Sequence, residues 1–528
     1  MKYKIKDKVF DFYYRDAAIT RKFHYKKPTS FLRFTAICTI FATMNKETSI
    51  ITTKDFNIND IKVDDFYLDV LELLPYQPSE EQIEAFAAFA HFLKNPQSRS
   101  VFLLNGYAGT GKTSLFGAIV KALTQRGTKV ILLAPTGRAA HVFSEYSQHQ
   151  AYTIHRKIYR QDSYLSEGFD LAENKHTNTI FIVDEASMIA NSSSEGAIFG
   201  SGRLLDDLVS YVYNGNGCKL MLMGDGGQLS PIGHNEIPAL NPQILKGYGL
   251  TVYNISLTTI ARQASDSGIL QNATIVRNIL TSGQLAPPKL QLTQYNDIEA
   301  LSGEFLMETL NDCYDRDGIE ETIVITRSNK RATLYNAGVR NMILYREEEL
   351  TTGDMLLVAK NNYYWTKDYK ELDFIANGDV MCVKRMWGDV ERAYGLKFAN
   401  VTVEFPDHNN LEMDVKIVID SLMSETPSLT LSQSNTLYNE VINELTGNKR
   451  ERYKQMKEHP YFNALQVKFA YAVTCHKAQG GQWKNVFIDM GGIMLEALST
   501  IDFMRWLYTA ITRATSRVYL INCPLSNT

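Results

Sequence analysis

The stretch "SVFLLNGYAGTGKTS" (residues 100–114) joins an apolar run to the helix-like segment "SLFGAIVKALTQ". It contains the pattern G-x-x-x-x-G-K-[ST], whose glycines let backbone N–H groups surround a phosphate at a helix N-terminus. In this pattern the lysine reaches the outer phosphates and the threonine can coordinate Mg²⁺. A purely structural glycine loop is the alternative, and the strand–loop–helix context argues against it. The predicted nucleotide contacts are Gly106, Ala108, Gly109, Thr110, Gly111, Lys112, Thr113 and Ser114.

Other short apolar runs flank this loop and end in polar turns. Runs of this kind are typical of strands buried on both faces of a parallel α/β sheet. One group of runs lies near the loop and a second group lies far along the chain, so two parallel-sheet domains are expected. Within the second group, short strands joined by Asn-Gly-Asp and Pro-Asp turns predict a small β-barrel insertion. The two groups are "KVILLAPT", "TIFIVDEAS" and "CKLMLMGD", then "ETIVITRSN", "FAYAVT", "NVFIDMG" and "SRVYLINC".

Composition bounds the possible classes of protein. The 528 residues are 45% hydrophobic and carry a formal net charge of −3, which favours several globular domains and excludes a uniformly basic surface. Nucleic acid would therefore be bound in local grooves. The six cysteines show no zinc or disulfide spacing and fit a reducing, cytoplasmic location. No apolar run reaches the roughly 20 residues that cross a membrane.

The N-terminus is basic: residues 1–34 carry ten Lys or Arg against three Asp. We interpret this segment as a peripheral extension. A basic arm that contacts nucleic acid is the alternative, and Met44 is an alternative start of the natural protein.

An acidic pair, Asp184 and Glu185, follows the apolar run "TIFIV". Downstream of a phosphate-binding loop, the aspartate suits a hold on Mg²⁺ and the glutamate suits polarising the attacking water. A pair that merely caps the strand end is the alternative.

The stretch "LMLMGDGGQLSPIG" (220–233) narrows the class of ATPase, because Gly-Asp-x-x-Gln-Leu-x-Pro resembles motif III of superfamily 1 helicases. Further resemblances follow in the order of that family, over about residues 75–528. They are closest to the RecD-like and Dda-like helicases of subfamily B, particularly compact RecD-like proteins of Bacteroides-type bacteria. The matching stretches are "LLAPTGRAA" (motif Ia), "TIHRKIY" (Ib), "SLTTIARQ" (IV), "VTCHKAQGGQW" (V) and "WLYTAITRATSRVYLI" (VI).

The resemblance implies an N-terminal extension (1–74), a RecA-like domain 1A (75–255) and a RecA-like domain 2A (256–348 and 425–528). It also implies an SH3-like β insertion at 349–424 and a strand-separating pin within 159–178. Tyr164 or Phe169 would tip the pin, with a plain surface loop as the alternative. The insertion's aromatics, Tyr363, Tyr364 and Trp365, are expected in its core rather than stacked on bases.

The resemblance also assigns roles to single residues. Arg262 and Arg513 would meet the γ-phosphate, and Gln228 would sense it. Gln82 would read adenine, while Gln482 would approach the nucleotide. Contacts to nucleic acid would come from Pro135, Thr136, Arg138, His155, Thr474, His476 and Lys477, with packed histidines as the alternative at the two His positions.

Together these patterns predict a monomeric helicase that uses ATP and Mg²⁺, moves 5′→3′ on single-stranded DNA and unwinds duplex. An RNA-directed motor of the same superfamily and an ATP-gated DNA clamp are the alternatives. Motif III departs from the family at Ser230, where proline is common, and at Gly226-Gly227. Both departures are expected to loosen this loop.

Overall fold

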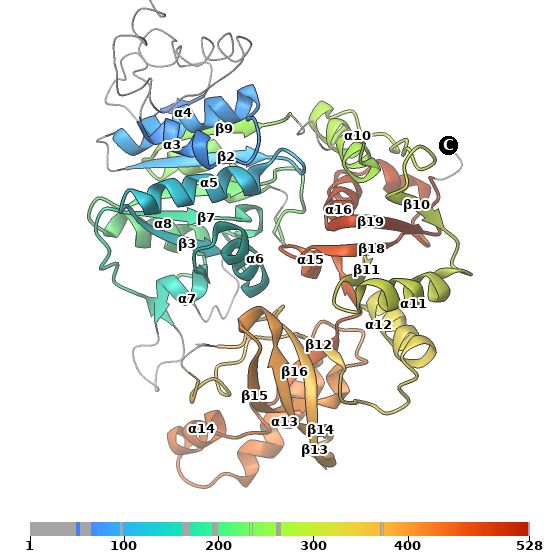
Figure 1. Cartoon of the computed structure of the whole chain (residues 1–528). Coiled ribbons are helices and arrows are strands. Elements are labelled where there is room, and N and C mark those ends of the chain that lie inside the picture. The colour runs from blue at the N-terminus through green and yellow to red at the C-terminus, as the bar shows by residue number, and fades with distance from the viewer. Residues whose placement is uncertain are drawn as a thin grey trace, which may run out of the picture.

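The computed structural model describes residues 49–52, 65–95, 99–160, 169–192, 199–231, 233–234, 236–259, 266–369, 372 and 374–525. Its three parts are two parallel β-sheets flanked by helices and a closed five-stranded barrel (Figure 1). The two sheets stand side by side in the upper part of Figure 1, and the barrel lies below them. The predicted α/β fold with two RecA-like domains and a barrel insertion is confirmed.

The first sheet has seven parallel strands in the order β1-β9-β2-β8-β7-β3-β4. Alternate residues of β2 face opposite sides: Phe102 and Leu104 pack under α4 and α5, whereas Val101 and Leu103 pack with α8. Because both faces of the strand are buried, its sequence is a continuous apolar run. The strands are Ile50–Ile51, Thr251–Leu257, Ser100–Gly106, Lys219–Gly224, Thr179–Val183, Lys129–Ala134 and Ala151–Thr153; the helices are α4 Glu80–Lys94, α5 Lys112–Gln125 and α8 Leu204–Asn214.

The second sheet has five parallel strands in the order β10-β19-β18-β11-β17. Helices α10 (Gly268–Ser282) and α16 (Ile501–Ile511) share one apolar core with it, and α11 (Leu306–Asp317) and α12 (Asn329–Gly338) share another. The strands are Ile298–Leu301, Ala514–Ile521, Trp483–Asp489, Thr322–Thr326 and Ala472–Thr474.

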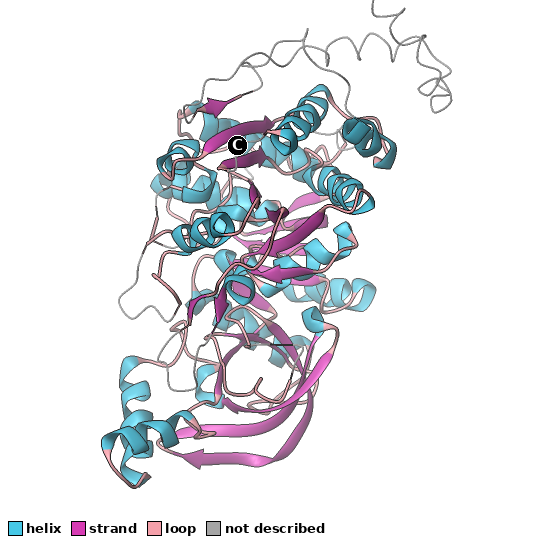
Figure 2. Ribbon diagram, turned by 90° about the vertical axis from the view of Figure 1, so that its left-hand side faces the viewer, coloured by secondary structure: helices cyan, strands magenta, loops and turns pink. Residues whose placement is uncertain are grey.

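The barrel closes through β12-β13-β14-β15-β16 and fills the lower part of Figure 2. Its fifth strand, β16, and the helices α13 and α14 that pack on its outside lie beyond the expected range 349–424. The barrel extends beyond the expected range because β16 pairs with β12 and β15, a long-range contact that no local pattern predicts. The elements are Met355–Val358, Val380–Ala393, Leu396–Phe405, Leu411–Val418 and Leu465–Phe469, with α13 Leu431–Glu444 and α14 Lys449–Lys457.

Two other boundaries also differ from the expected ones. Strand β1 pairs with β9, and α3 (Asp65–Leu73) packs into the core of the first domain, so this domain begins before residue 75. Strand β9 continues to Leu257 inside the first sheet, whereas 256 was expected to begin the second domain.

The basic segment 1–34 and Met44 lie outside the described residues. Within the described part of the chain, no helix combines the length and the apolarity that a membrane crossing needs. The five cysteines described there, Cys218, Cys313, Cys382, Cys475 and Cys523, are all free thiols.

Candidate nucleotide site

The phosphate-binding loop leaves β2 and enters α5 with Gly109 and Gly111 in left-handed backbone conformations (φ 75° and 77°). Side chains rarely adopt this conformation, so glycine is required at both positions. The Lys112 ammonium group donates to the carbonyl oxygens of Gly106 and Tyr107, the latter at 2.9 Å. The lysine is thereby held over the loop, with its charge directed at the space where phosphates would bind.

Asp184 and Glu185 follow β7 at the same edge of the sheet. Tyr146, on α6 (Gly137–Ser147), donates its hydroxyl to one Asp184 oxygen, and the Glu185 amide donates to the other at 2.7 Å. Burial, and secondly the charge of Glu185, raises the pKa of Asp184 to about 6. Glu185 itself has φ 49°, a conformation that costs a non-glycine residue roughly 1–2 kcal/mol. Strain of this kind is concentrated at functional sites.

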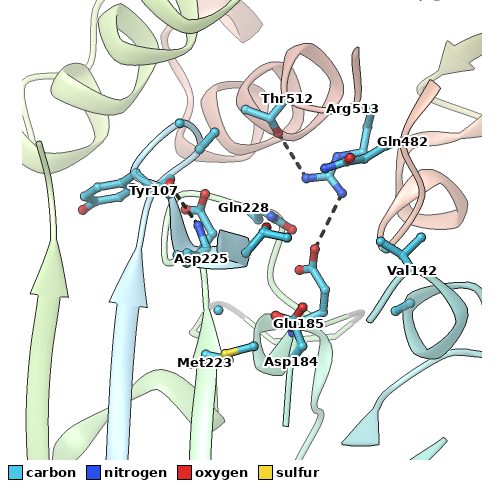
Figure 3. Close-up of a pocket in the computed structure, with 18 of the residues that line it drawn as sticks. Tyr107, Val142, Asp184, Glu185, Met223, Asp225, Gln228, Gln482, Thr512 and Arg513 are labelled. Atoms are coloured by element: carbon cyan, nitrogen blue, oxygen red, sulfur yellow. Dashed lines mark hydrogen bonds and ion pairs between the residues drawn. The ribbon is translucent and has the colours of Figure 1, made fainter. Parts of the chain in front are cut away.

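Arg513 reaches this edge from the second domain. It is 4% exposed, and its Nη1 lies 3.8 Å from Oε1 of Glu185, across the cavity in Figure 3. Its Nε donates to the Thr509 carbonyl oxygen at 3.1 Å, which fixes the direction of the guanidinium. Both domains line this cavity of about 300 Å³, whose polar side chains include Lys112, Thr113, Asp184, Glu185, Asp225, Gln228, Gln482 and Arg513.

The motif III loop is held firmly by the second domain. The Leu229 amide donates to Oγ1 of Thr509 at 2.9 Å, and the Leu229 carbonyl oxygen accepts from Nε2 of Gln479 at 3.2 Å. Ser230 donates to the His234 carbonyl oxygen at 2.7 Å. Partners distant in sequence thus constrain this loop, and the expected loosening by Ser230 and Gly226-Gly227 stays a prediction.

Gln228 lines the cavity and is 4% exposed. Its Oε1 is buried and has no hydrogen-bond partner among the described residues. A buried acceptor without a partner costs roughly 1–3 kcal/mol, so a ligand that donates to it would remove this cost. This is the position expected of a residue that contacts a bound nucleotide or its water.

Two other glutamines were expected at the nucleotide. Gln82 binds the phosphate-binding loop itself: its Nε2 donates to the Thr110 carbonyl oxygen at 2.9 Å, and its Oε1 accepts from the Ser79 amide. It is absent from the residues that line the cavity, whereas Gln482 is among them. Arg262 lies outside the described residues.

The residues expected to contact nucleic acid begin at motif Ia. Thr136 caps α6, where its Oγ1 accepts from the Ala139 amide at 3.2 Å, and Pro135 precedes it at partial exposure. Arg138, on α6 of the first domain, packs against the second domain, with its guanidinium carbon 4.2 Å from the ring centre of Trp483. The structure thus gives Arg138 a contact between domains, and a role in binding nucleic acid stays a prediction.

The two histidines differ in their surroundings. His155 packs against Phe199, with ring centres 4.8 Å apart, and burial lowers its pKa to about 4. His155 therefore fits the alternative of a packed histidine, because its neutral ring would add no charge to a phosphate contact. His476 is exposed, next to Thr474 at the N-terminus of α15 (Cys475–Ala478). Lys477 donates to the side-chain oxygen of Asn377, in the barrel.

In the range expected to hold the pin, the described residues form a two-stranded antiparallel pair, β5 (Tyr159–Arg160) with β6 (Asp170–Leu171), and the role of a pin stays a prediction. Tyr164 lies outside the described residues. Phe169 lies beside β6 and packs on Tyr363 of the barrel region, with ring centres 4.8 Å apart, rather than standing free as a tip. Tyr363 therefore serves a contact between domains.

The other two aromatics of the insertion lie next to each other, and Trp365 packs as expected. Trp365 is partly buried against the barrel core and donates to the Asn463 carbonyl oxygen at 2.9 Å. The Tyr364 ring meets that of Trp365 edge-on.

Sequence reasoning missed three side chains at this site: Tyr146, Asp225 and Tyr508. Asp225 stands inside the quoted motif III and could have been singled out as the only carboxylate of that loop. Tyr146 and Tyr508 lie on helices whose patterns are typical of core packing. No local pattern marks them, because their partners lie far away in the sequence.

The shared cavity and the two parallel sheets define a P-loop nucleotide site between paired RecA-like domains. Comparison with known families agrees: the model of an AAA domain matches residues 77–279, and that of a UvrD-like helicase C-terminal domain matches residues 469–521. The chain is similar in sequence to the DNA helicases RecD2 and Dda, in agreement with the resemblance of its motifs.

The curated relatives are distant. The ATP-dependent RecD2 DNA helicase of Deinococcus radiodurans is 26% identical over 84% of this chain and 48% of its own length. Dda of phage T4 is 26% identical over 49% of this chain and 56% of its own length. An uncharacterised mimivirus protein, R530, is 22% identical over 80% of this chain and 96% of its own. The chain thus spans about half the length of the two named helicases.

Among solved structures, Pif1 helicase from Bacteroides in complex with ADP-AlF3 and ssDNA superposes with a TM-score of 0.42 at 16% identity. The match covers 85% of this chain and 93% of that one.

Proposed function

We propose that the chain is an ATP-dependent DNA helicase that moves 5′→3′ along single-stranded DNA as a monomer and separates duplex ahead of it. The observation that carries the proposal is the shared cavity, in which Arg513 of one domain faces Glu185 of the other. Because the site is complete only when the two domains meet, hydrolysis depends on the distance between them. The direction of movement rests on the family resemblance alone.

In the proposed reaction, Glu185 polarises the water that attacks the γ-phosphate. Arg513 stabilises the charge that develops there, since guanidinium donates several hydrogen bonds to phosphate oxygens and stays protonated. Gln228 can accept from the water and donate to a phosphate oxygen at once, which fits its unpartnered Oε1.

The donor set also fits Mg²⁺. The Thr113 hydroxyl and the Asp184 carboxylate line the same cavity, and hard oxygen ligands of this kind suit that ion. When bound there, Mg²⁺ would neutralise phosphate charge. Its binding would also offset the burial that raises the pKa of Asp184.

Single-stranded DNA would contact the loops of motifs Ia and V, which meet in space. A Cβ atom at Gly480 of motif V would lie 3.2 Å from Oγ1 of Thr136 of motif Ia. Loops that present short or basic side chains can hold phosphates without reading sequence. A change in domain separation would move one loop relative to the other and so shift the strand.

The decisive experiment compares ATP hydrolysis and strand separation on forked DNA for the wild type, Lys112→Ala and Lys121→Ala. The first variant removes the phosphate-contacting charge, and we expect both activities to fall by about a hundredfold or more. Lys121, on the same helix but away from the cavity, is the matched control. ATP hydrolysis without strand separation would contradict the helicase proposal and support the ATP-gated DNA clamp. Stronger stimulation of hydrolysis by RNA than by a matched DNA would support the RNA-directed motor.

Gln228→Ala is expected to leave ATP affinity within about threefold of the wild type while lowering unwinding per ATP hydrolysed by about tenfold. The side chain contacts the γ-phosphate region rather than the loop that binds most of the nucleotide. Fluorescent-nucleotide binding, ATPase and unwinding assays on the same samples measure the two effects. A loss of affinity equal to the loss of unwinding would contradict the sensor role.

Lys477 gives a prediction for pH. Burial lowers its pKa to about 8, so the side chain is charged below about pH 8 and loses its charge as pH rises further. If it contacts a DNA phosphate, the Kd for single-stranded DNA should rise by about threefold between about pH 7 and pH 9. Lys477→Arg keeps its charge over this range and should flatten the profile. Equal profiles for both proteins would remove Lys477 from the DNA contacts.

A further inference from the structure

One hydroxyl group joins the two domains next to the nucleotide site. Tyr508, on α16 of the second domain, accepts a hydrogen bond from the Ala108 amide of the phosphate-binding loop at 2.9 Å. The same hydroxyl donates to Oδ2 of Asp225, in motif III, at 2.6 Å. Tyr508 and Asp225 are each 1% exposed, so water does not compete for these bonds.

The direction of both bonds is fixed by chemistry. A backbone amide can only donate, and a phenol can accept one hydrogen bond while donating another. Burial, and secondly the charge of Asp225, raises the pKa of Tyr508 well above its usual value, so the hydroxyl keeps its proton. The other Asp225 oxygen accepts from the Gly227 amide at 2.9 Å. The chain of donors therefore runs from the phosphate-binding loop through Tyr508 to motif III.

The surroundings are shaped to admit this ring. A Cβ atom at Gly227 would lie 3.0 Å from Cε1 of Tyr508, too close for a side chain without movement. This close approach explains why residue 227 is a glycine although its φ does not lie in the left-handed region. The next residue, Thr509, binds motif III through its hydroxyl and holds Arg513 through its carbonyl oxygen. A single turn of α16 thus contacts the phosphate-binding loop, motif III and the arginine of the cavity.

We propose that Tyr508 is a positioning residue that makes ATP hydrolysis depend on closure of the two domains. This inference rests on the proposed ATPase function. Its hydroxyl is bonded to the first domain alone, although the residue belongs to the second. Separation of the domains breaks both bonds in one movement, which releases the phosphate-binding loop and motif III together. Tyr508 is absent from the residues that line the cavity, so it acts through Ala108 and Asp225 rather than on the substrate.

The test is Tyr508→Phe in the full chain, because phenylalanine keeps the ring packing and removes only the hydroxyl. With saturating single-stranded DNA, kcat for ATP should fall by about tenfold while KM for ATP stays within about threefold. Tyr519→Phe is the matched control: it removes another buried hydroxyl of the second domain, which lies near Cys313 and away from the cavity. Unchanged kcat, or a rise of KM as large as the fall of kcat, would overturn the proposal.

A second measurement does not depend on activity. Hydrogen exchange of peptides that cover residues 104–112 and 222–230 should be faster in Tyr508→Phe than in the wild type, and unchanged in Tyr519→Phe. If the wild type hydrolyses no ATP, the proposed function fails, and faster exchange would still show that the hydroxyl joins the domains. Equal exchange in all three proteins would refute the link itself.

Asp225→Asn provides a backup if Tyr508→Phe does not fold. Asparagine keeps one of the two acceptor oxygens, so it loses the bond that either Tyr508 or the Gly227 amide donates, and a smaller fall in kcat in the same direction is expected. Combining the two substitutions should lower kcat no further than Tyr508→Phe alone, because both break one chain of bonds. Additive losses would contradict the proposal.

Discussion

Arg513→Ala is expected to lower DNA-stimulated ATP hydrolysis by about a thousandfold, the effect typical of an arginine that crosses to a transferring phosphoryl group. Arg513 is held for this role from several directions. Its Nη1 donates to the Gly481 carbonyl oxygen at 3.4 Å, its Nη2 donates to the Thr512 hydroxyl at 3.3 Å, and Glu185 faces it across the cavity (Figure 3). Alanine would remove the positive charge without touching the phosphate-binding loop.

Steady-state ATPase assays with and without single-stranded DNA measure this loss. Arg513→Lys should recover only a small part of the activity, since an ammonium group lacks the planar fork of guanidinium. Arg517→Ala, an exposed arginine on β19, is the matched control. A fall of less than about tenfold would show that hydrolysis does not need the second domain's arginine.

Glu185→Gln should lower kcat for ATP by about a thousandfold, within the range for loss of a group that handles the proton of the nucleophile. The amide has nearly the same shape, so the strained backbone at φ 49° and the contact with Ser187 can persist. Affinity for ATP is expected to stay within about threefold, because the substitution spares the residues that hold phosphates.

Rapid-quench measurement of a single turnover, together with nucleotide binding, separates these effects. Glu173→Gln, at an exposed glutamate of the same domain, serves as control. A variant that keeps more than about a tenth of the wild-type rate would show that Glu185 balances the charge of Arg513 and does not polarise the water.

Much of the fold follows from local patterns. Apolar runs such as "SVFLLNG" predict buried parallel strands because both faces of the sheet are covered, as Phe102 and Val101 on opposite faces show. The phosphate-binding loop is equally local, since its glycines, lysine and threonine act within one turn. Patterns fail where partners are distant: β1 joins the first sheet and β16 closes the barrel through pairing that neither short segment signals.

The candidate site divides in the same way. The sequence by itself determined which residues carry the chemistry of phosphate and water, since Lys112, Asp184 and Glu185 stand at strand ends of one sheet. Only the tertiary structure decided how the second domain completes it. Tyr508, an ordinary core residue by pattern, joins Ala108 to Asp225, and the motif III loop is held by bonds from another domain. Hydrogen bonds depend on distance in space, and a linear pattern records only distance along the chain.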